Sequence, residues 1–164
     1  MKNLHTPVML KEVMSFIPSN KLINVIDATF GGGGYTKEIL KKENVVELLA
    51  IDRDPISVQL LKNLKIKNIN FNLINEKFSK IENIVLGSKI NEKKFDIVIF
   101  DLGTSSNQID NSDRGFSFKN TGPLDMRMDS SSHPSAFDIV NFCSEQILAD
   151  IIFYYGEEKK AFKI

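Results

Sequence analysis

The fold of this chain is decided by one stretch near its N-terminus, Leu22-Ile23-Asn24-Val25-Ile26-Asp27-Ala28-Thr29-Phe30-Gly31-Gly32-Gly33-Gly34-Tyr35. The apolar residues at its start predict a buried strand that ends at Asp27. The glycines that follow let the backbone turn sharply and approach a ligand with no side chain in the way. A helix is expected from Tyr35 to about Lys42. A strand, a glycine loop and a helix in this order open a parallel sheet covered by helices.

The chain continues the same alternation. Further strands are expected at 45–51, 69–74 and 95–100. Thr6 followed by Pro7 predicts the start of a helix that runs to about Ile17, and Asp54 followed by Pro55 predicts another. Ser79 and Glu82 have the spacing of a capping box for a short helix. The sequence therefore predicts a single α/β domain with a Rossmann-like sheet.

Residues 102–134 show neither helical nor strand periodicity. The segment is rich in Gly, Ser, Asp, Arg and Phe. A loop this long inside a compact domain is usually functional or disordered, and the aromatic and paired charged residues favour a functional loop. Two helices are expected after it, at 135–141 and 144–155, the second stopped by Gly156.

The first, second and fourth expected strands each end in an acid. The three acids are Asp27, Asp52 and Asp101. Parallel sheets bind ligands at the carboxyl ends of their strands, so the three residues are expected to converge. Asp52 can accept hydrogen bonds from both ribose hydroxyls of an adenosine group. Asp27 suits a ligand with an amino group and a sulfonium cation, whereas it would repel a pyrophosphate. The glycine loop could alternatively be no more than a structural turn.

Two other nucleotide motifs fit less well. A dinucleotide fingerprint that started at Gly31 would need glycine where Thr36 stands, and the chain has no Gly-Lys-Ser/Thr of a P-loop. A nicotinamide-dependent oxidoreductase is therefore a weaker alternative, and no acid for hydride transfer is evident. These details favour S-adenosylmethionine as the ligand.

The motif Asp101-Leu102-Gly103-Thr104-Ser105-Ser106 stands where amino-methylating enzymes hold their target nitrogen. An exocyclic amine of cytosine is a poor nucleophile, so catalysis needs in-line positioning and an acceptor for the amine protons. Asp101 is the candidate acceptor, with Ser105 and Ser106 orienting the base. In the alternative, Asp101 only caps the following turn.

Two phenylalanines in the long loop, Phe116 and Phe118, could stack on an extruded base while Arg114 or Arg127 holds a phosphate. Equally, the two rings could pin the loop to the sheet. The whole chain carries 21 basic and 21 acidic residues, so any contact with RNA must be local.

The composition of the chain argues against several classes of protein. With 164 residues the chain can bury one core. No apolar run approaches the length that crosses a bilayer, and the N-terminus has no secretory pattern, so a cytoplasmic location without membrane contact is expected. One cysteine and two histidines predict neither an internal disulfide nor a metal site. The oligomeric state is not predicted.

Six ordered motifs together resemble one family, MraW/RsmH, whose members are 16S ribosomal RNA cytosine-N4 methyltransferases. The motifs are Asp27-Ala28-Thr29-Phe30-Gly31, Ala50-Ile51-Asp52-Arg53-Asp54-Pro55, Asp101-Leu102-Gly103 with Ser105-Ser106, Arg114-Gly115-Phe116-Ser117-Phe118, Gly122-Pro123-Leu124-Asp125-Met126-Arg127-Met128-Asp129 and Tyr155-Gly156-Glu157-Glu158. The resemblance implies an S-adenosylmethionine-dependent methyltransferase that acts on the small ribosomal subunit. It also implies a set of cofactor contacts: Gly33, Gly34, Tyr35, Asp52, Phe78, Asp101 and Gln108.

The chain departs from the family in two ways. Tyr35 stands where the family usually has histidine, and family members run to roughly twice this length. The resemblance thus implies a methyltransferase domain at 1–134, with its active-site loop at 102–134, and the start of a helical insert at 135–164. The C-terminal side of the sheet would be incomplete, with an open edge at the fourth strand. A fragment, a split gene and a partial sequence remain alternatives, and so does a non-catalytic remnant that binds S-adenosylmethionine or a partner chain.

Overall fold

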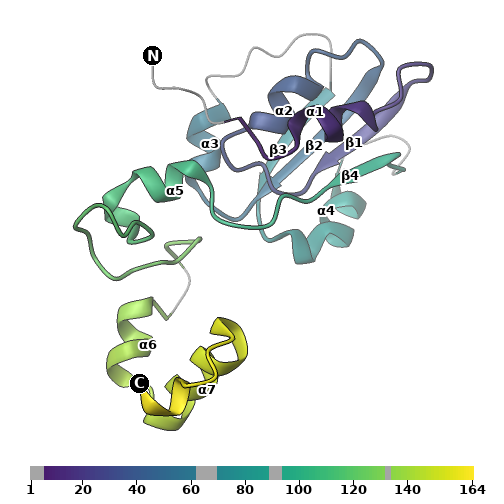
Figure 1. Cartoon of the computed structure of the whole chain (residues 1–164). Helices are drawn as coiled ribbons and strands as arrows, with labels where there is room; N and C mark the ends of the chain where they lie inside the picture. The colour runs from purple at the N-terminus through teal and green to yellow at the C-terminus, as the bar shows by residue number, and fades with distance from the viewer. Residues whose placement is uncertain (1–5, 62–69, 89–93, 132–133) are drawn as a thin grey trace. The chain divides into compact units, whose positions relative to one another are not determined.

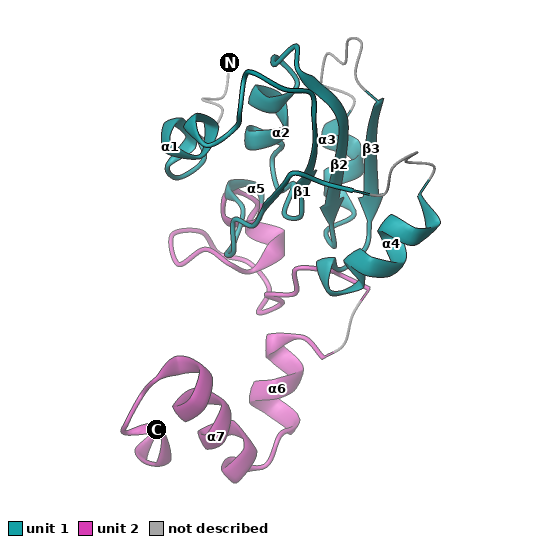
Figure 2. Cartoon of the chain, turned by 90° about the vertical axis from the view of Figure 1, so that its right-hand side faces the viewer, with its two compact units in different colours: residues 1–107 teal, residues 108–164 magenta. Residues whose placement is uncertain are grey.

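The computed structural model describes residues 6–61, 70–88, 94–131 and 134–164. The chain forms two compact units, Met1–Asn107 and Gln108–Ile164, which are described separately (Figure 2).

The first unit is built on a parallel sheet of four strands in the order β3-β2-β1-β4 (Figure 1). The strands are β1 Ile23–Asp27, β2 Val45–Asp52, β3 Asn70–Asn75 and β4 Ile97–Ile99. All four were expected from the apolar pattern, although β4 is shorter than expected and Ile69 lies outside the described residues. The chain adds β2 and β3 on one side of β1 and then returns to add β4 on the other side, which creates a switch point beside the carboxyl end of β1.

Both faces of the sheet are covered by apolar side chains. On one face α1 (Leu10–Ser15) and α2 (Gly34–Ile39) pack over a core cluster that includes Val25 and Leu48. On the other face α4 (Ile81–Gly87) packs over a second cluster that includes Ile26 and Leu49. Neighbouring residues of one strand thus belong to opposite faces, as the strand period of two requires.

The first helix begins later than expected. It starts at Leu10 instead of near Thr6, because Met9 before it has a left-handed backbone with φ of 50°. The proline signal at Pro7 was wrong as a helix start, since the Pro7 ring packs against Gly34 instead.

Two other helix starts were predicted in this unit, and one of these predictions is confirmed while the other is wrong. Helix α3 (Ile56–Leu61) follows Asp54, whose carboxylate accepts the N–H of Ile56 at 3.1 Å, so the expected cap is confirmed. The capping box at Ser79 is wrong, because a 3₁₀ turn, η1 (Phe78–Lys80), occupies that position and α4 has no side-chain cap.

Strand β4 lies at the edge of the sheet. Within the described part of the chain its only sheet neighbour is β1. Val98 on this strand and Phe100 directly after it are 45% and 50% exposed. The expected open edge with exposed apolar side chains is confirmed for these residues.

The second unit contains α6 (Ala136–Phe142) and α7 (Glu145–Gly156), with short turns η2 (Ser112–Arg114) and η3 (Ala161–Lys163). Both long helices were expected. Ser135 caps α6 through a reciprocal pair of hydrogen bonds with Asp138, and Ser144 caps α7. The turn after α7 has its left-handed residue at Glu157, with φ of 54°, rather than at Gly156.

One expectation for residues 102–134 was wrong. Helix α5 (Ser106–Asp110) lies within the segment that showed no periodicity. It has only 5 residues, too few to produce a recognisable apolar repeat. None of the helices in the described ranges is both long and apolar enough to cross a membrane.

Candidate functional site at the carboxyl ends of the strands

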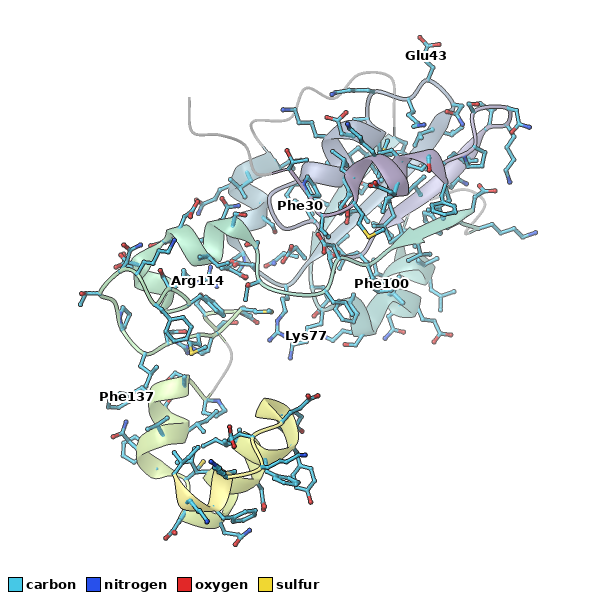
Figure 3. All side chains as sticks on the ribbon, viewed as in Figure 1. Phe30, Glu43, Lys77, Phe100, Arg114 and Phe137 are labelled. Atoms are coloured by element: carbon cyan, nitrogen blue, oxygen red, sulfur yellow. The ribbon has the colours of Figure 1, made fainter. Side chains whose placement is uncertain are left out.

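The loop after β1 forms backbone hydrogen bonds with both neighbouring strands. The N–H of Ala28 donates to the carbonyl of Ile99 in β4, and the N–H of Phe30 donates to the carbonyl of Ile51 in β2, each at 2.9 Å. Figure 3 labels Phe30 in this loop and Phe100 at the end of β4, with Glu43 at the opposite end of the sheet. The loop is thus held in the position that a ligand at the switch point would approach.

Glycine is required at two positions of this loop. Gly33 has φ of 75°, and a Cβ there would lie 2.9 Å from the ring of the buried Phe30. A Cβ at Gly34 would collide with the Pro7 ring. These two positions therefore tolerate no side chain. The loop backbone that leads into α2 is thus not covered by side chains of its own at these residues.

Asp52 forms the second side of the site. Its Oδ2 accepts the N–H of Gly31 at 2.5 Å, and its Oδ1 accepts the N–H of Asp54 at 2.8 Å. A carboxylate oxygen has two acceptor positions, so each oxygen of Asp52 keeps one for a further donor. Burial raises the pKa of Asp52, and the hydrogen bonds from Asp54 and Gly31 oppose that rise. The contact of Asp52 with two ribose hydroxyls would use these acceptor positions and stays a prediction.

Asp27 lies at the end of β1, as expected, and its carboxylate is buried. The side chain is fully buried, and it accepts the Thr36 hydroxyl at 2.6 Å and the Thr29 N–H at 3.3 Å. Burial raises its pKa to about 6, against the lowering effect of the hydrogen bonds from Thr36 and Thr29. Asp27 therefore anchors the loop to α2, and its contact with an amino group or a sulfonium stays a prediction.

Asp101 follows β4 and lies beside the glycine loop. Its N–H donates to the Thr29 hydroxyl oxygen at 2.7 Å. The next residues pack against the bare glycines: a Cβ at Gly31 would lie 3.7 Å from that of Ser105, and one at Gly32 would lie 3.4 Å from the Asn107 side-chain nitrogen. The structure thus brings the glycine loop, Asp101 and Ser105 together. Ser106 is the first residue of α5.

Two aromatic rings border the same end of the sheet. Phe78 and Phe100 meet edge to face, with ring centroids 5.5 Å apart and planes at 81°. They are 41% and 50% exposed. Phe78 was named only through the family resemblance, and Phe100 was missed altogether. The apolar strand pattern places Phe100 on the sheet, but only the structure shows that its ring meets Phe78.

Tyr35 is largely inside the core, at 5% exposure. Its hydroxyl donates to the carbonyl of Val8. Burial raises its pKa, with a smaller contribution from the negative charges of Asp101 and Asp27. The hydroxyl therefore ties the segment before α1 to the start of α2.

The remaining residues expected at the site belong to the second unit. Gln108 in α5 is buried, at 5% exposure. Arg114 donates to the carbonyls of Arg127 and Met128, at 2.8 and 2.9 Å.

The Arg127 guanidinium pairs with Asp125 at 2.6 Å. This ion pair holds the pKa of Asp125 below its usual range. Because both guanidinium groups hold atoms of the loop itself, a phosphate-binding role for either stays a prediction. Phe118 is fully exposed and Phe116 is half-buried, so of the two only Phe118 presents a whole ring to solvent.

Sequence reasoning missed Thr29 and Thr36. Thr36 was noted only as a residue that breaks the dinucleotide fingerprint. Its place in the first turn of α2, nine residues after Asp27, was the available sign that its hydroxyl could reach a buried carboxylate at the end of β1. No pattern in the sequence indicated the role of Thr29, because that role depends on the path of the chain after β4.

Comparison with known proteins gives names to relatives of this chain. A 12S rRNA N(4)-cytidine methyltransferase METTL15 from Homo sapiens is 44% identical over 170 residues, covering 100% of this chain and 41% of that protein. Proteins named Ribosomal RNA small subunit methyltransferase H are 42% identical in Wolbachia sp. subsp. Drosophila simulans (strain wRi) and 44% identical in Ehrlichia canis (strain Jake), each covering 98% of this chain and 54% of the relative. The chain thus spans about half the length of these curated relatives.

The family match extends over residues 2–164, nearly the whole chain. The order of its motifs, its parallel Rossmann-like sheet and its named relatives agree with that match. The chain belongs to the MraW methylase family.

Proposed function

We propose that this chain forms the S-adenosylmethionine-binding half of a methyltransferase that modifies the N4 amine of a cytosine in 16S ribosomal RNA. The observation that carries the proposal is the carboxylate of Asp52, held by two backbone N–H groups beside the bare glycine loop. The MraW family and the rRNA methyltransferase names of the relatives support the same reaction.

The residues at the strand ends fit this cofactor. Asp52 would accept both ribose hydroxyls through the acceptor positions that Gly31 and Asp54 leave open. Gly33 and Gly34 would present backbone, and Phe78 would offer a half-exposed ring to the adenine. Gln108, Tyr35 and Asp101 complete the proposed set of contacts. When bound, S-adenosylmethionine supplies a methyl group activated by its sulfonium.

Asp101 is proposed as the group that accepts a proton from the cytosine amine. The amine lone pair is delocalised into the ring, so the nitrogen needs a hydrogen-bond acceptor and fixed orientation to attack. The backbone of Asp101 is held by Thr29, and Ser105, which lies beside Gly31, is proposed to orient the base. Ser106 is proposed to share that role.

The substrate is proposed to be the RNA of the small ribosomal subunit. The balanced charge of the chain argues against a long electrostatic track, so recognition would rely on local contacts. A fully exposed ring such as Phe118 could stack on an unpaired base. We propose residues 1–134 as the catalytic domain, 102–134 as its active-site loop and 135–164 as the start of a helical insert. A small subunit in the cytoplasm would be the place of action.

The proposal is tested with the full-length protein. Calorimetric titration measures S-adenosylmethionine binding. Transfer of a labelled methyl group to isolated small subunits, followed by mass spectrometry of the nucleosides, identifies the product. Binding together with N4-methylcytidine in 16S RNA supports the proposal. Binding without transfer favours the non-catalytic remnant, and transfer confined to 12S RNA corrects the substrate. Asp101→Asn is expected to lower the rate of transfer by about 100-fold or more.

A further inference from the structure

Thr29 occupies the point where β1 and β4 separate. The last paired residues of the two strands are Asp27 and Ile99, and the Ala28 N–H makes the final backbone bond, to the Ile99 carbonyl at 2.9 Å. One step further, the N–H of Asp101 is taken by the Thr29 hydroxyl at 2.7 Å. A side chain therefore adds one more hydrogen bond between the two strands, at the residue that carries the candidate acceptor.

The path of the chain after β4 makes this bond important. No regular secondary structure is assigned to residues 100–105, and Gly103 has φ of 148°. The backbone of Asp101 therefore has no sheet partner of its own, since the ladder between β1 and β4 stops at Ile99. A hydrogen bond to its N–H is a direct constraint on where its Cα, and so its carboxylate, can lie.

Thr29 is itself held firmly. Its N–H donates to Asp27 Oδ1, and the other oxygen of that buried carboxylate accepts the Thr36 hydroxyl. A β-branched side chain has few χ1 choices, so the hydroxyl has few alternative positions once the backbone is held. The chain of bonds Thr36–Asp27–Thr29–Asp101 thus connects the start of α2 to the backbone of Asp101.

We propose that Thr29 is a positioning residue, whose hydroxyl fixes the Asp101 carboxylate relative to the glycine loop and thereby sets the rate of methyl transfer. The proposal rests on the proposed function, because Asp101 is taken as the acceptor of the amine proton. A misplacement of about 1 Å in such a site can cost up to about 100-fold in rate.

The test compares three threonine variants of the full-length protein. Thr29→Val keeps the shape of the side chain but removes the acceptor, whereas Thr29→Ser keeps the acceptor. Thr6→Val makes the same change at an exposed threonine before α1 and is the matched control. Thr29→Val is expected to lower kcat by about 10- to 100-fold, with the Kd and KM for S-adenosylmethionine changed less than threefold. Thr29→Ser is expected to recover most of kcat, and Thr6→Val to behave as wild type.

A second measurement needs no substrate. Hydrogen exchange at the Asp101 amide, followed by NMR, reports the bond directly. Exchange is expected to quicken in Thr29→Val and to stay slow in Thr29→Ser and Thr6→Val. A Thr29→Val protein with kcat within twofold of wild type overturns the proposal, as does equal loss of rate in the serine variant. If wild type transfers no methyl group while the amide is protected as expected, the proposed function fails although the hydrogen bond is present.

Discussion

The hydroxyl of Thr36 donates to the carboxylate of Asp27 at 2.6 Å, and both side chains are completely buried. The bond joins the first turn of α2 to the end of β1, where the loop leaves the sheet. A carboxylate in such a place is costly to ionise, because its charge is removed from water and only partly compensated by hydrogen bonds.

The pH dependence of stability should report this cost. Burial raises the pKa of Asp27 from 3.8 to about 6, so between these values the folded state holds a proton that the unfolded chain has lost. The contribution of Asp27 to the free energy of unfolding is thus most favourable below the lower value, and falls by roughly 3 kcal/mol as pH rises through the interval. Above a pH of about 6, the contribution of Asp27 no longer changes with pH.

Asp27→Asn isolates this contribution, since the amide does not titrate. Chemical denaturation of both proteins at several pH values gives the difference in unfolding free energy, in which the effects of the other acids cancel. We expect wild type to lose stability relative to the variant between about pH 4 and pH 6.5. A difference that does not change with pH would show that Asp27 titrates normally.

Binding of S-adenosylmethionine should depend on Asp52. Asp52→Asn puts an NH₂ group where the carboxylate accepts an N–H from Gly31 or Asp54, so it loses an acceptor for ribose and disturbs the loop. A hydrogen bond to a charged group contributes about 1.5–3 kcal/mol, so calorimetry should show Kd raised by roughly 10- to 100-fold.

Asp96→Asn is the control for that experiment. Asp96 stands before β4, at the amino end of the sheet, and pairs with Lys21 on the surface. Its variant is expected to bind the cofactor with Kd within twofold of wild type. Equal affinity in Asp52→Asn and wild type would remove Asp52 from the site.

The strands could be predicted from the sequence because each contains a continuous or alternating set of apolar residues that ends in an acid or a turn. The run from Leu22 to Ile26 can hardly form anything but a buried strand before glycines. The start of α1 could not be predicted, because the conformation of Pro7 is decided by its packing against Gly34, which follows β1. A local helix signal contains no information about that contact.

The site was predicted in part. The convergence of acids follows from parallel strands, which is why Asp52 and Asp101 were expected beside the glycine loop, where the structure has them. The direction of each side chain is a separate question, and Asp27 shows the difference: its position was right and its carboxylate turns inward to Thr36. The pairing of Phe100 with Phe78 and the bond from Asp101 to Thr29 depend on tertiary geometry, so no spacing in the sequence reveals them.

Gly33 should be intolerant of any side chain. Gly33→Ala forces φ of 75° on a residue with a Cβ and brings that atom to 2.9 Å from Phe30. Such a backbone costs about 1–3 kcal/mol, and thermal or chemical unfolding should show a loss of that size. At Gly87, the last residue of α4, no atom of the described residues lies within 4 Å of an added Cβ, so Gly87→Ala should be neutral or slightly stabilising. Equal losses in the two variants would contradict the role of the loop conformation.

Tyr35 offers a test of how the chain uses the position where its family usually has histidine. Because its hydroxyl donates to the Val8 carbonyl and its ring is 5% exposed, the side chain contributes chiefly to stability. Tyr35→Phe should lower the free energy of unfolding by about 0.5–1 kcal/mol. Cofactor binding should be unchanged within twofold, since any contact to S-adenosylmethionine would come from the backbone or the ring.

Tyr155→Phe is the matched control, because Tyr155 is 87% exposed at the end of α7 and its hydroxyl is available to water. Its unfolding free energy should equal that of wild type within about 0.5 kcal/mol. If Tyr35→Phe instead raised the Kd for S-adenosylmethionine tenfold and left stability unchanged, its hydroxyl would have to leave Val8 for the cofactor. That result would make the segment before α1 a part that moves when the cofactor binds, because Val8 would lose its bond to α2.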